Sequence, residues 1–281
     1  MEKLFKLGVM ISTGITGSLV FMILAFLLYF AFPLFESDLF LNFFTWVWDE
    51  KTGHYGLLPM VLGTAYISLL ATVFATIMAF SLASLIESFL PKKMAFYLEG
   101  LLVLLCGVPT VVYAFGALFL VVPSINYYIA ESKGLSILSA SFVLSFVVLP
   151  TMSLMFLNAF RALPKQYKKA GLSLGISSQE LFFYMVVPYA KRDILSAIIF
   201  GFSRAVGDTL IALMLAGNAL AIPHSLLDSA RTLTAHIALI NANDYESIAF
   251  KAIFLSALLL FVFTCSMVLA IRLVHKKEIH G

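Results

Sequence analysis

Charged side chains are scarce in this sequence. Only 12% of its 281 residues are Asp, Glu, Lys or Arg, whereas 62% are hydrophobic. Soluble domains carry about 25% charged residues, so this composition excludes a soluble globular protein. The net charge of +3 does not indicate nucleic-acid binding. The sequence therefore predicts an all-α integral membrane protein with several spans and no soluble domain.

Cysteines and catalytic motifs are also few. Cys106 and Cys265 stand alone in apolar runs, which indicates neither a disulfide framework nor a metal site, and we interpret both as small core residues. The sequence contains no G-x-x-x-x-G-K-[ST] phosphate-binding loop and no nucleophile–base arrangement. We therefore expect no enzymatic activity and no cofactor bound by this chain. If transport is driven by ATP, a partner subunit uses the ATP and Mg²⁺.

Long apolar runs are what the sequence has in abundance. A transmembrane helix needs about 20 apolar residues, and six runs meet that length or come close to it with short polar connections. The six predicted spans are 8–35, 57–86, 94–122, 135–160, 194–215 and 248–274. No internal repeat is evident, which weighs against a secondary transporter built from two related halves.

The basic residues predict the orientation of these spans. Six spans place both termini, loop 87–93 and insert 161–193 on one side, which holds thirteen of the 18 Lys and Arg residues. The other side holds four, and Arg204 lies within a span. Because cytoplasmic loops are enriched in Lys and Arg, we expect both termini in the cytoplasm and the protein in the cell inner membrane.

The third run is interrupted by Gly107, Val108 and Pro109. Proline at 109 removes the hydrogen bond to the carbonyl of Leu105, so the span should kink or unwind there. Backbone groups freed at membrane depth are tolerated where they are buried in protein or line a wet cavity. Pro109 and Thr110 are therefore candidates for a pathway, and a kink that improves packing is an equal alternative.

Insert 161–193 is long for a loop between spans. Residues 167–174 read as one helix, Gly175 breaks it, and Ser177 or Ser178 can cap a second helix that Pro188 ends. Apolar residues within this exposed insert indicate docking, either to a groove of a partner or to the bilayer face. A solvated basic loop lying on lipid headgroups is the alternative.

Arg204 and Asp208 lie in the apolar fifth run. They are four residues apart, so on a helix they share one face. An ionisable residue at membrane depth costs at least ~3 kcal/mol, which makes the pair a candidate functional site. The guanidinium suits phosphate oxygens, Ser203 and Thr209 could replace part of an anion's hydration, and Asp208 could neutralise Arg204 when the path is empty. The alternative is a permanent ion pair that fixes helix packing.

The insert resembles the EAA loop of ABC-importer permeases, E-A-A-x3-G-x9-I-x-L-P. Lys169 replaces the leading glutamate of that pattern and Gly171 replaces its second alanine. In that family this loop forms the coupling helices that dock on the ATPase subunit. The resemblance implies that ATPase coupling falls on the matching residues. They are Lys169, Ala170, Gly171, Gly175 and Pro188, with Met185 and Val187 completing the pattern.

Two further stretches resemble phosphate-importer permeases. Residues 106–119 resemble their GIPSVVYG stretch, with Thr110 in place of serine. Residues 202–218 resemble their GRALGETMAVxMVxGN stretch, with Asp208 in place of glutamate, and 231–238 also look like that family. The sequence after Gly207 resembles the PstC-type permease more than its PstA-type companion.

The resemblance implies a six-helix, MetI-like type I ABC importer permease. Residues 1–56 would form the first transmembrane helix and an outer loop, and residues 57–281 the permease core with coupling loop 161–193. The chain would be half of the pore of an ATP-driven inorganic phosphate importer. Its partners would be a second, PstA-type permease, a dimer of ATP-binding subunits and an extracytoplasmic phosphate-binding protein. The expected translocation path comprises Arg204, Asp208, Ser203, Thr209, Pro109 and Thr110.

Three rival functions remain at this point. The nearest is an ABC permease for another oxyanion such as sulfate, molybdate or tungstate. The others are an ion-coupled secondary transporter and a membrane scaffold that transports nothing.

Overall fold

The computed structural model describes residues 2–35, 40–129, 134–240 and 247–276. These residues are mostly helical, which confirms the all-α prediction. Two short strands, β1 (Trp48–Asp49) and β2 (His54–Tyr55), form a hairpin. The α-helices are α1 (Glu2–Phe35), α2 (Leu58–Ser84), α3 (Lys92–Cys106), α4 (Thr110–Tyr128), α5 (Ile137–Arg161), α6 (Lys165–Ser173), α7 (Ser178–Leu181), α8 (Val187–Gly207), α9 (Leu210–Leu215), α10 (Leu233–Leu239) and α11 (Ile248–Lys276). The other helical turns are η1 (Phe40–Phe44), η2 (Leu85–Phe89) and η3 (Phe182–Val186).

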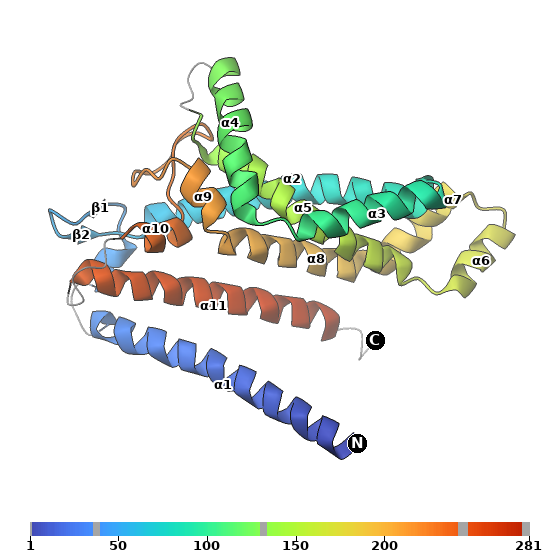
Figure 1. The fold of residues 1–281 in the computed structure, drawn as a ribbon, viewed down its shortest axis with the longest axis horizontal. Coiled ribbons are helices and arrows are strands. Elements are labelled where there is room, and N and C mark those ends of the chain that lie inside the picture. Colours follow the sequence, from blue (N-terminus) through green and yellow to red (C-terminus); the bar gives the residue numbers. More distant parts are fainter. Residues whose placement is uncertain (1, 36–39, 130–133, 241–246, 277–281) are drawn as a thin grey trace.

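Helices α2, α5 and α8 form the centre of the bundle (Figure 1). Small residues allow these helices to approach closely. The α2 face against the core carries fully buried alanines at every fourth position, which share one side of the helix. They are Ala71, Ala75, Ala79 and Ala83. On α8, a Cβ at Gly201 would overlap the sulfur of Met152 on α5, so glycine sets that helix–helix distance.

Helices α1 and α11 form a layer beside this centre, with α11 packed on α8 (Figure 1). The Phe30 ring of α1 stacks on Phe254 of α11 at a centroid distance of 4.6 Å. The first turn of α1 and the last turn of α11 lie toward the same end of the bundle as α6 (Figure 1). In the described part of the chain, five helices are long and apolar enough to cross a membrane. They are Phe5–Phe35, Leu58–Phe89, Thr110–Tyr128, Ile137–Arg161 and Ile248–Val274. The count of six spans and the cytoplasmic termini stay predictions.

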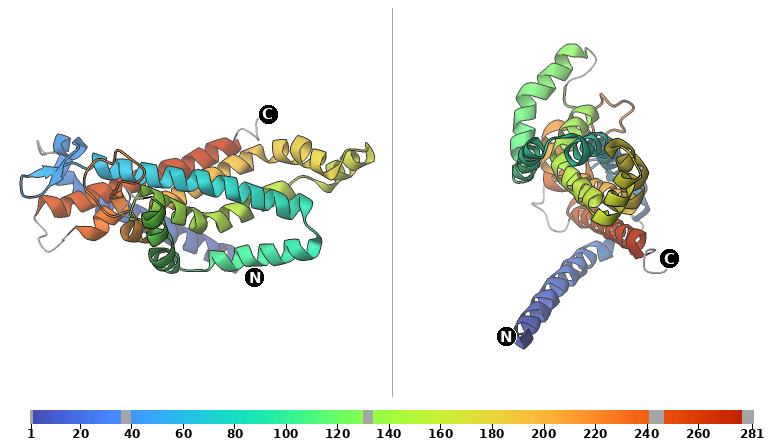
Figure 2. Two further views of the ribbon diagram at one scale, coloured as in Figure 1. Left: turned by 90° about the horizontal axis from the view of Figure 1, so that it is seen from above. Right: turned by 90° about the vertical axis from the view of Figure 1, so that its right-hand side faces the viewer.

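Helix α4 leaves the axis of the bundle. The predicted span 94–122 is two helices, α3 and α4, and Figure 2 shows α4 nearly end-on in the view where α2 and α3 lie lengthwise. One end of α4 packs on α9 and α5, whereas Phe115, Phe119 and Leu120 are largely exposed. The predicted loop after Pro123 is wrong for its first residues, because α4 continues through that proline to Tyr128. Proline has a helical φ and costs one hydrogen bond, which the run of apolar residues around it outweighs. Residues 130–133 of that loop lie outside the described residues.

The two cysteines are not core residues, contrary to the prediction. Both Cys106 on α3 and Cys265 on α11 are exposed. An apolar run predicts burial in bilayer or protein, and it does not say which face of the helix meets the rest of the chain. In this chain both thiols lie on faces that the bundle leaves uncovered.

A second hydrophobic core lies at the opposite end of the bundle. We call this end the hairpin end; it comprises the β1–β2 hairpin, α10, and the parts of α2 and α11 that the hairpin and α10 contact. Trp48 is buried there, pairs with Tyr55 across the hairpin and meets the ring of His236 edge-on at 4.3 Å. The Thr64 hydroxyl on α2 accepts a hydrogen bond from the N–H of Leu233 at 2.9 Å. These contacts attach the segment before the last helix to α2.

Candidate translocation site and coupling segment

Arg204 lies in the last turn of α8, and its side chain is exposed. The helix ends at Gly207, and Asp208 follows with an extended backbone (φ −76°, ψ 122°). The prediction that the two share one helix face is therefore wrong. Asp208 instead accepts a hydrogen bond from the N–H of Ile211 at 2.9 Å, and this turn starts α9. An Asp side chain that satisfies a local N–H competes with a continuing helix, which explains the stop.

The charges of Arg204 and Asp208 are not joined in this structure. Among the described residues, no Arg204 nitrogen lies within 4.0 Å of an acidic oxygen. The backbone carbonyl of Asp208 accepts a hydrogen bond from the Thr234 hydroxyl at 3.1 Å, which ties the break to α10. The half-buried hydroxyls of Ser203 and Thr209 flank this region and have no hydrogen-bond partner within the described residues. Arg204 thus forms no direct ion pair within the described residues, although Asp208 is near enough for the two charges to interact.

The second candidate stretch forms the corner between α3 and α4. Pro109 is the residue before α4, and Thr110 begins that helix. Leu105 loses its usual partner at Pro109, but its carbonyl accepts hydrogen bonds from the N–H of Val108 at 3.2 Å and from the Tyr113 hydroxyl at 3.3 Å. The carbonyl of Leu105 is therefore satisfied within the protein. Helix α4 packs on α9, which follows Arg204 and Asp208, so the two candidate stretches lie in neighbouring elements.

The predicted coupling residues lie on α6, on the turn after it and at the start of α8. Lys169 and Ala170 are exposed on α6, and Gly175 has a φ of +80°, which ends this part of the insert as predicted. Gly171 is buried, and a Cβ there would lie 3.1 Å from the side chains of Leu181 and Met185. Glycine in place of the family's alanine thus allows α6 to cross the next helix closely.

Pro188 does not end the second helix of the insert, contrary to the prediction. It follows the π-helical turn η3, in which the N–H of Val187 bonds to the carbonyl of Phe182, so the N–H that proline lacks falls where the hydrogen-bond pattern changes from π to α. The chain therefore continues as helix from Ser178 to Gly207 through the π-helical turn η3. The predicted insert 161–193 and the predicted fifth span share this one continuous rod.

Helix α7 begins with a reciprocal cap. The Ser177 hydroxyl accepts a hydrogen bond from the N–H of Glu180 at 3.3 Å, and the Glu180 carboxylate accepts one from the N–H of Ser177 at 2.9 Å. Hydrogen bonds from the hydroxyl and N–H of Ser177 lower the pKa of Glu180 below its ordinary value. Leu174 and Tyr184, on either side of α7, are about 80% exposed. A well-defined turn thus presents large apolar side chains to its surroundings.

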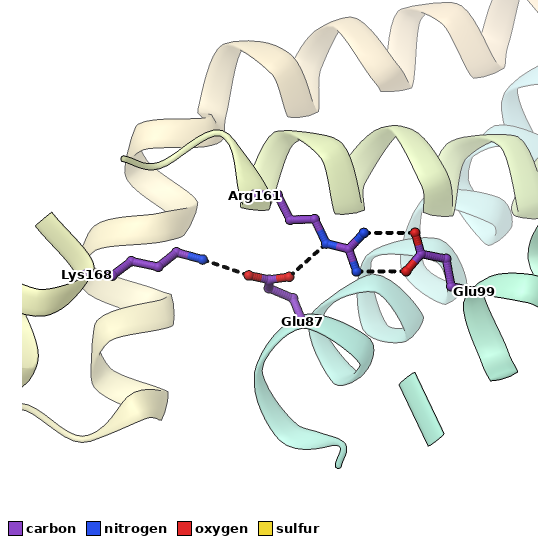
Figure 3. Close-up of polar contacts among 4 residues, drawn as sticks. All are labelled: Glu87, Glu99, Arg161 and Lys168. Atoms are coloured by element: carbon purple, nitrogen blue, oxygen red, sulfur yellow. Dashed lines mark hydrogen bonds and ion pairs between the residues drawn. The ribbon is translucent and has the colours of Figure 1, made fainter. Parts of the chain in front are cut away.

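A group of four charged residues was missed by the sequence reasoning. Arg161, Glu87, Glu99 and Lys168 meet where α2, α3, α5 and α6 converge (Figure 3). From the sequence, none of these four residues was assigned to a site. The sequence signal that could have indicated this group is Arg161 at the end of one predicted span, with Glu87 and Glu99 near the ends of two others.

A buried histidine was also missed. His236 on α10 is fully buried, and neither ring nitrogen has a hydrogen-bond partner within the described residues. Burial, with a smaller contribution from the charge of Arg231, lowers the pKa of His236 to about 3. Among the described residues, no three His, Cys, Asp or Glu side chains are grouped so that they could hold a metal ion. His236 is therefore a neutral packing residue at physiological pH.

Most of the chain is similar to a known protein family. Residues 75–277 match the family described as "Binding-protein-dependent transport system inner membrane component". The chain belongs to this family. It is thus a multi-pass inner-membrane protein and a permease component of an ABC importer.

Individual relatives support the assignment within this permease family. "Probable ABC transporter permease protein YqgH" of Bacillus subtilis is 30% identical over 234 residues, covering 83% of this chain and 76% of that protein. "Phosphate transport system permease protein PstC" of Xylella fastidiosa is 27% identical over 254 residues, covering 82% and 77%. "Phosphate transport system permease protein PstC 2" of Mycobacterium tuberculosis is 25% identical over 304 residues, covering 100% and 93%. The resemblance to PstC-type permeases is confirmed.

Solved structures of permeases show the same fold. The chain matches "Inward facing conformations of the MetNI methionine ABC transporter" with a TM-score of 0.60 at 14% identity, covering 78% of this chain and 95% of that one. It matches an amino acid ABC transporter with a TM-score of 0.56 at 15% identity, covering 79% and 92%. The predicted MetI-like fold is confirmed.

Proposed function

We propose that this chain is the PstC-type half of the membrane pore of an ATP-driven importer of inorganic phosphate. The observation that carries the proposal is Arg204, an exposed guanidinium at the end of a mostly apolar helix, whose nitrogens form no direct ion pair within the described residues. An arginine is charged at any working pH and offers a planar fork to two phosphate oxygens. The PstC relatives, whose printed names specify phosphate transport, support the choice of anion.

The path in this proposal is built around the end of α8. Arg204 would hold the anion with the hydroxyls of Ser203 and Thr209, and Asp208 would weaken that binding enough to permit release. The corner at Pro109 and Thr110 would line the same path from α4, which packs against α9. A second, PstA-type permease would complete the pore, because one chain leaves Arg204 and α4 uncovered.

The coupling segment in this proposal is the exposed turn around α6 and α7. Lys169, Ala170 and Gly175 would face a dimer of ATP-binding subunits, which use ATP and Mg²⁺, and the chain itself would bind no cofactor. The exposed side chains of Leu174 and Tyr184 support docking to a partner. An extracytoplasmic phosphate-binding protein would deliver the anion at the hairpin end. Closure of the ATPase pair would then reorient the bundle in alternating access.

Competition uptake tests the substrate. Phosphate uptake is measured in proteoliposomes that contain the intact complex, with excess sulfate, molybdate or tungstate added in turn. We expect uptake to fall under excess unlabelled phosphate alone. Loss of phosphate uptake under excess of another oxyanion would indicate that the importer binds that oxyanion, and would contradict the assignment of phosphate as its substrate. Collapsing the proton gradient at constant ATP should leave uptake unchanged, whereas loss would indicate an ion-coupled transporter.

Substitution of Arg204 tests the site. Arg204→Gln should lower phosphate uptake roughly 10- to 100-fold, since hydrogen bonds to a charged group are worth about 1.5–3 kcal/mol. The complex should still assemble, as judged by co-purification. Arg272→Gln, on the exposed face of α11, is the matched control and should leave uptake unchanged. Normal uptake by Arg204→Gln would refute the path, and loss of the protein from the membrane would favour a structural role.

A further inference from the structure

Three ion pairs join side chains of η2, α3, α5 and α6, and one of them reaches α6 (Figure 3). The two terminal nitrogens of Arg161 each donate to one oxygen of Glu99, both at 2.8 Å. The Nε of Arg161 donates to Oε2 of Glu87 at 3.1 Å, and Lys168 donates to the other oxygen of Glu87 at 2.7 Å. Glu87 therefore bridges two cations that belong to different helices.

The four residues of this group belong to four different helical elements. Glu87 lies on the π-helical turn η2 at the end of α2, Glu99 on α3, and Arg161 is the last residue of α5. Lys168 lies on α6, one residue before the predicted coupling residue Lys169. Among the described residues, the Lys168–Glu87 contact is the one side-chain hydrogen bond or ion pair that joins α6 to a helix outside residues 161–193. Helix α6 also packs on the helix that follows it, where Gly171 lies against Leu181 and Met185.

The environment favours a defined geometry over a mobile surface pair. The side chain of Glu87 is 15% exposed, and those of Lys168, Glu99 and Arg161 are 29%, 34% and 41% exposed. Isolated exposed pairs contribute about 0–1 kcal/mol, but a bidentate arginine within a network is the exception to that rule. Two carboxylates balance two cations, so the group is neutral as a whole. Arg161 is held by Glu99 even without Glu87, which leaves Lys168 dependent on Glu87 alone.

We propose that Glu87 and Lys168 are positioning residues that make α6 move together with α2, α3 and α5, so that a displacement of the coupling segment reaches the core of the bundle. The proposal rests on the proposed function, in which α6 and α7 dock an ATPase. Glu87 transmits the displacement of α6 through its two carboxylate oxygens. One oxygen binds Lys168 on α6, and the other binds Arg161 on α5, whose guanidinium also binds Glu99 on α3. Loss of the link should separate ATP hydrolysis from transport without removing either partner.

The test compares transport and ATP hydrolysis in one preparation of the reconstituted complex. Lys168→Met and Glu87→Gln should each lower the substrate transported per ATP hydrolysed by roughly 5-fold or more, the lower end of coupling between sites. ATP hydrolysis and co-purification of the subunits should be retained. The double variant should be no worse than either single variant, because both remove the same link. Lys168→Arg should stay within about 2-fold of the parent because it keeps the ion pair.

The matched control is Lys93→Met, which removes an exposed lysine near the start of α3 that has no partner within the described residues. It should leave the transport-to-hydrolysis ratio unchanged. An unchanged ratio in Glu87→Gln would overturn the proposal, even if Lys168→Met were uncoupled, since Lys168 would then act on the ATPase directly. Additive losses in the double variant would overturn it too.

A second readout separates this proposal from the proposed function. In the purified chain alone, amide hydrogen exchange in α6 should become faster in Lys168→Met and in Glu87→Gln, and stay unchanged in Lys93→Met. Faster exchange in the two variant chains, together with a parent complex that imports no phosphate, would support the link and refute the proposed function. Unchanged exchange in the variant chains, together with a parent complex that imports phosphate, would refute the link alone.

Discussion

The two ends of the bundle are held together by different kinds of contact. At the α6 end, partly exposed ion pairs join Glu87, Glu99, Arg161 and Lys168. At the hairpin end, the buried ring of His236 packs edge-on against Trp48, and neither of its nitrogens has a hydrogen-bond partner within the described residues. Coulomb energy changes gradually with distance, whereas overlap between packed atoms is penalised steeply. The α6 end can therefore shift while it stays attached, and the hairpin end gives the bundle a fixed reference.

The strongest challenge to the fixed end is Gly63→Ala. A Cβ there would overlap the carbonyl oxygen of Arg231, a backbone atom that cannot rotate away. We expect a loss of about 1–3 kcal/mol in the free energy of unfolding, the usual cost of overpacking. Thermal unfolding in detergent measures it. Gly14→Ala, within α1 and with no atom within 4 Å of the new Cβ, should be neutral or slightly stabilising. Equal effects of the two substitutions would show that the hairpin end is not tightly packed.

Acid should weaken the hairpin end through His236. Its pKa is about 3 in the folded protein and about 6.5 unfolded, so between these values the unfolded chain binds more protons. Stability is therefore complete above about pH 6.5 and falls as the pH falls. Between pH 7.5 and 5.5 we expect a loss of about 1 kcal/mol, which His236→Phe should abolish. Unfolding of both proteins across this range measures the difference, and identical pH profiles would contradict the prediction.

The smallest expected effect lies at the cap of α7. Ser177→Ala removes the acceptor for the N–H of Glu180, which costs about 0.5–1 kcal/mol of local helix stability. Hydrogen exchange should become faster in residues 177–181, while the backbone bridge between Gly217 and Ala230 at the other end stays protected. Faster exchange at both ends would mean that they unfold together.

Four of the six predicted spans each fall mainly on one helix, and two, 94–122 and 194–215, are each divided between two helices. The predicted fourth span, 135–160, differs by no more than two residues at either end from α5 (Ile137–Arg161). Apolar runs record removal from water, and that property is local to the run. The break at Gly107–Pro109 was also predictable, because the N–H that Pro109 lacks is likewise a local property of the chain. The direction that α4 takes was not, because it depends on contact with α9, which lies about a hundred residues further along the chain.

The sequence identified the residues of the candidate site but did not predict how they are arranged. Arg204 stood out as a charge in an apolar run, but the spacing of four to Asp208 implied a shared face that the stop at Gly207 removes. The group around Glu87 could not be found from spacing, because its pairs are 62 to 81 residues apart in sequence. Only the folded chain brings these residues together.

The π-helical turn η3 constrains the length of the chain in this region. Such a turn accommodates one more residue than an α-helical turn, and successive residues of a helix differ by about 100°. Deleting one residue between Phe182 and Val186 would restore a regular helix and rotate α7 by that angle relative to α8. Leu181 and Phe182 would then leave the core in which both are buried. Substitutions at the exposed positions of η3, Phe183 and Tyr184, leave this orientation intact, whereas a single-residue deletion changes it.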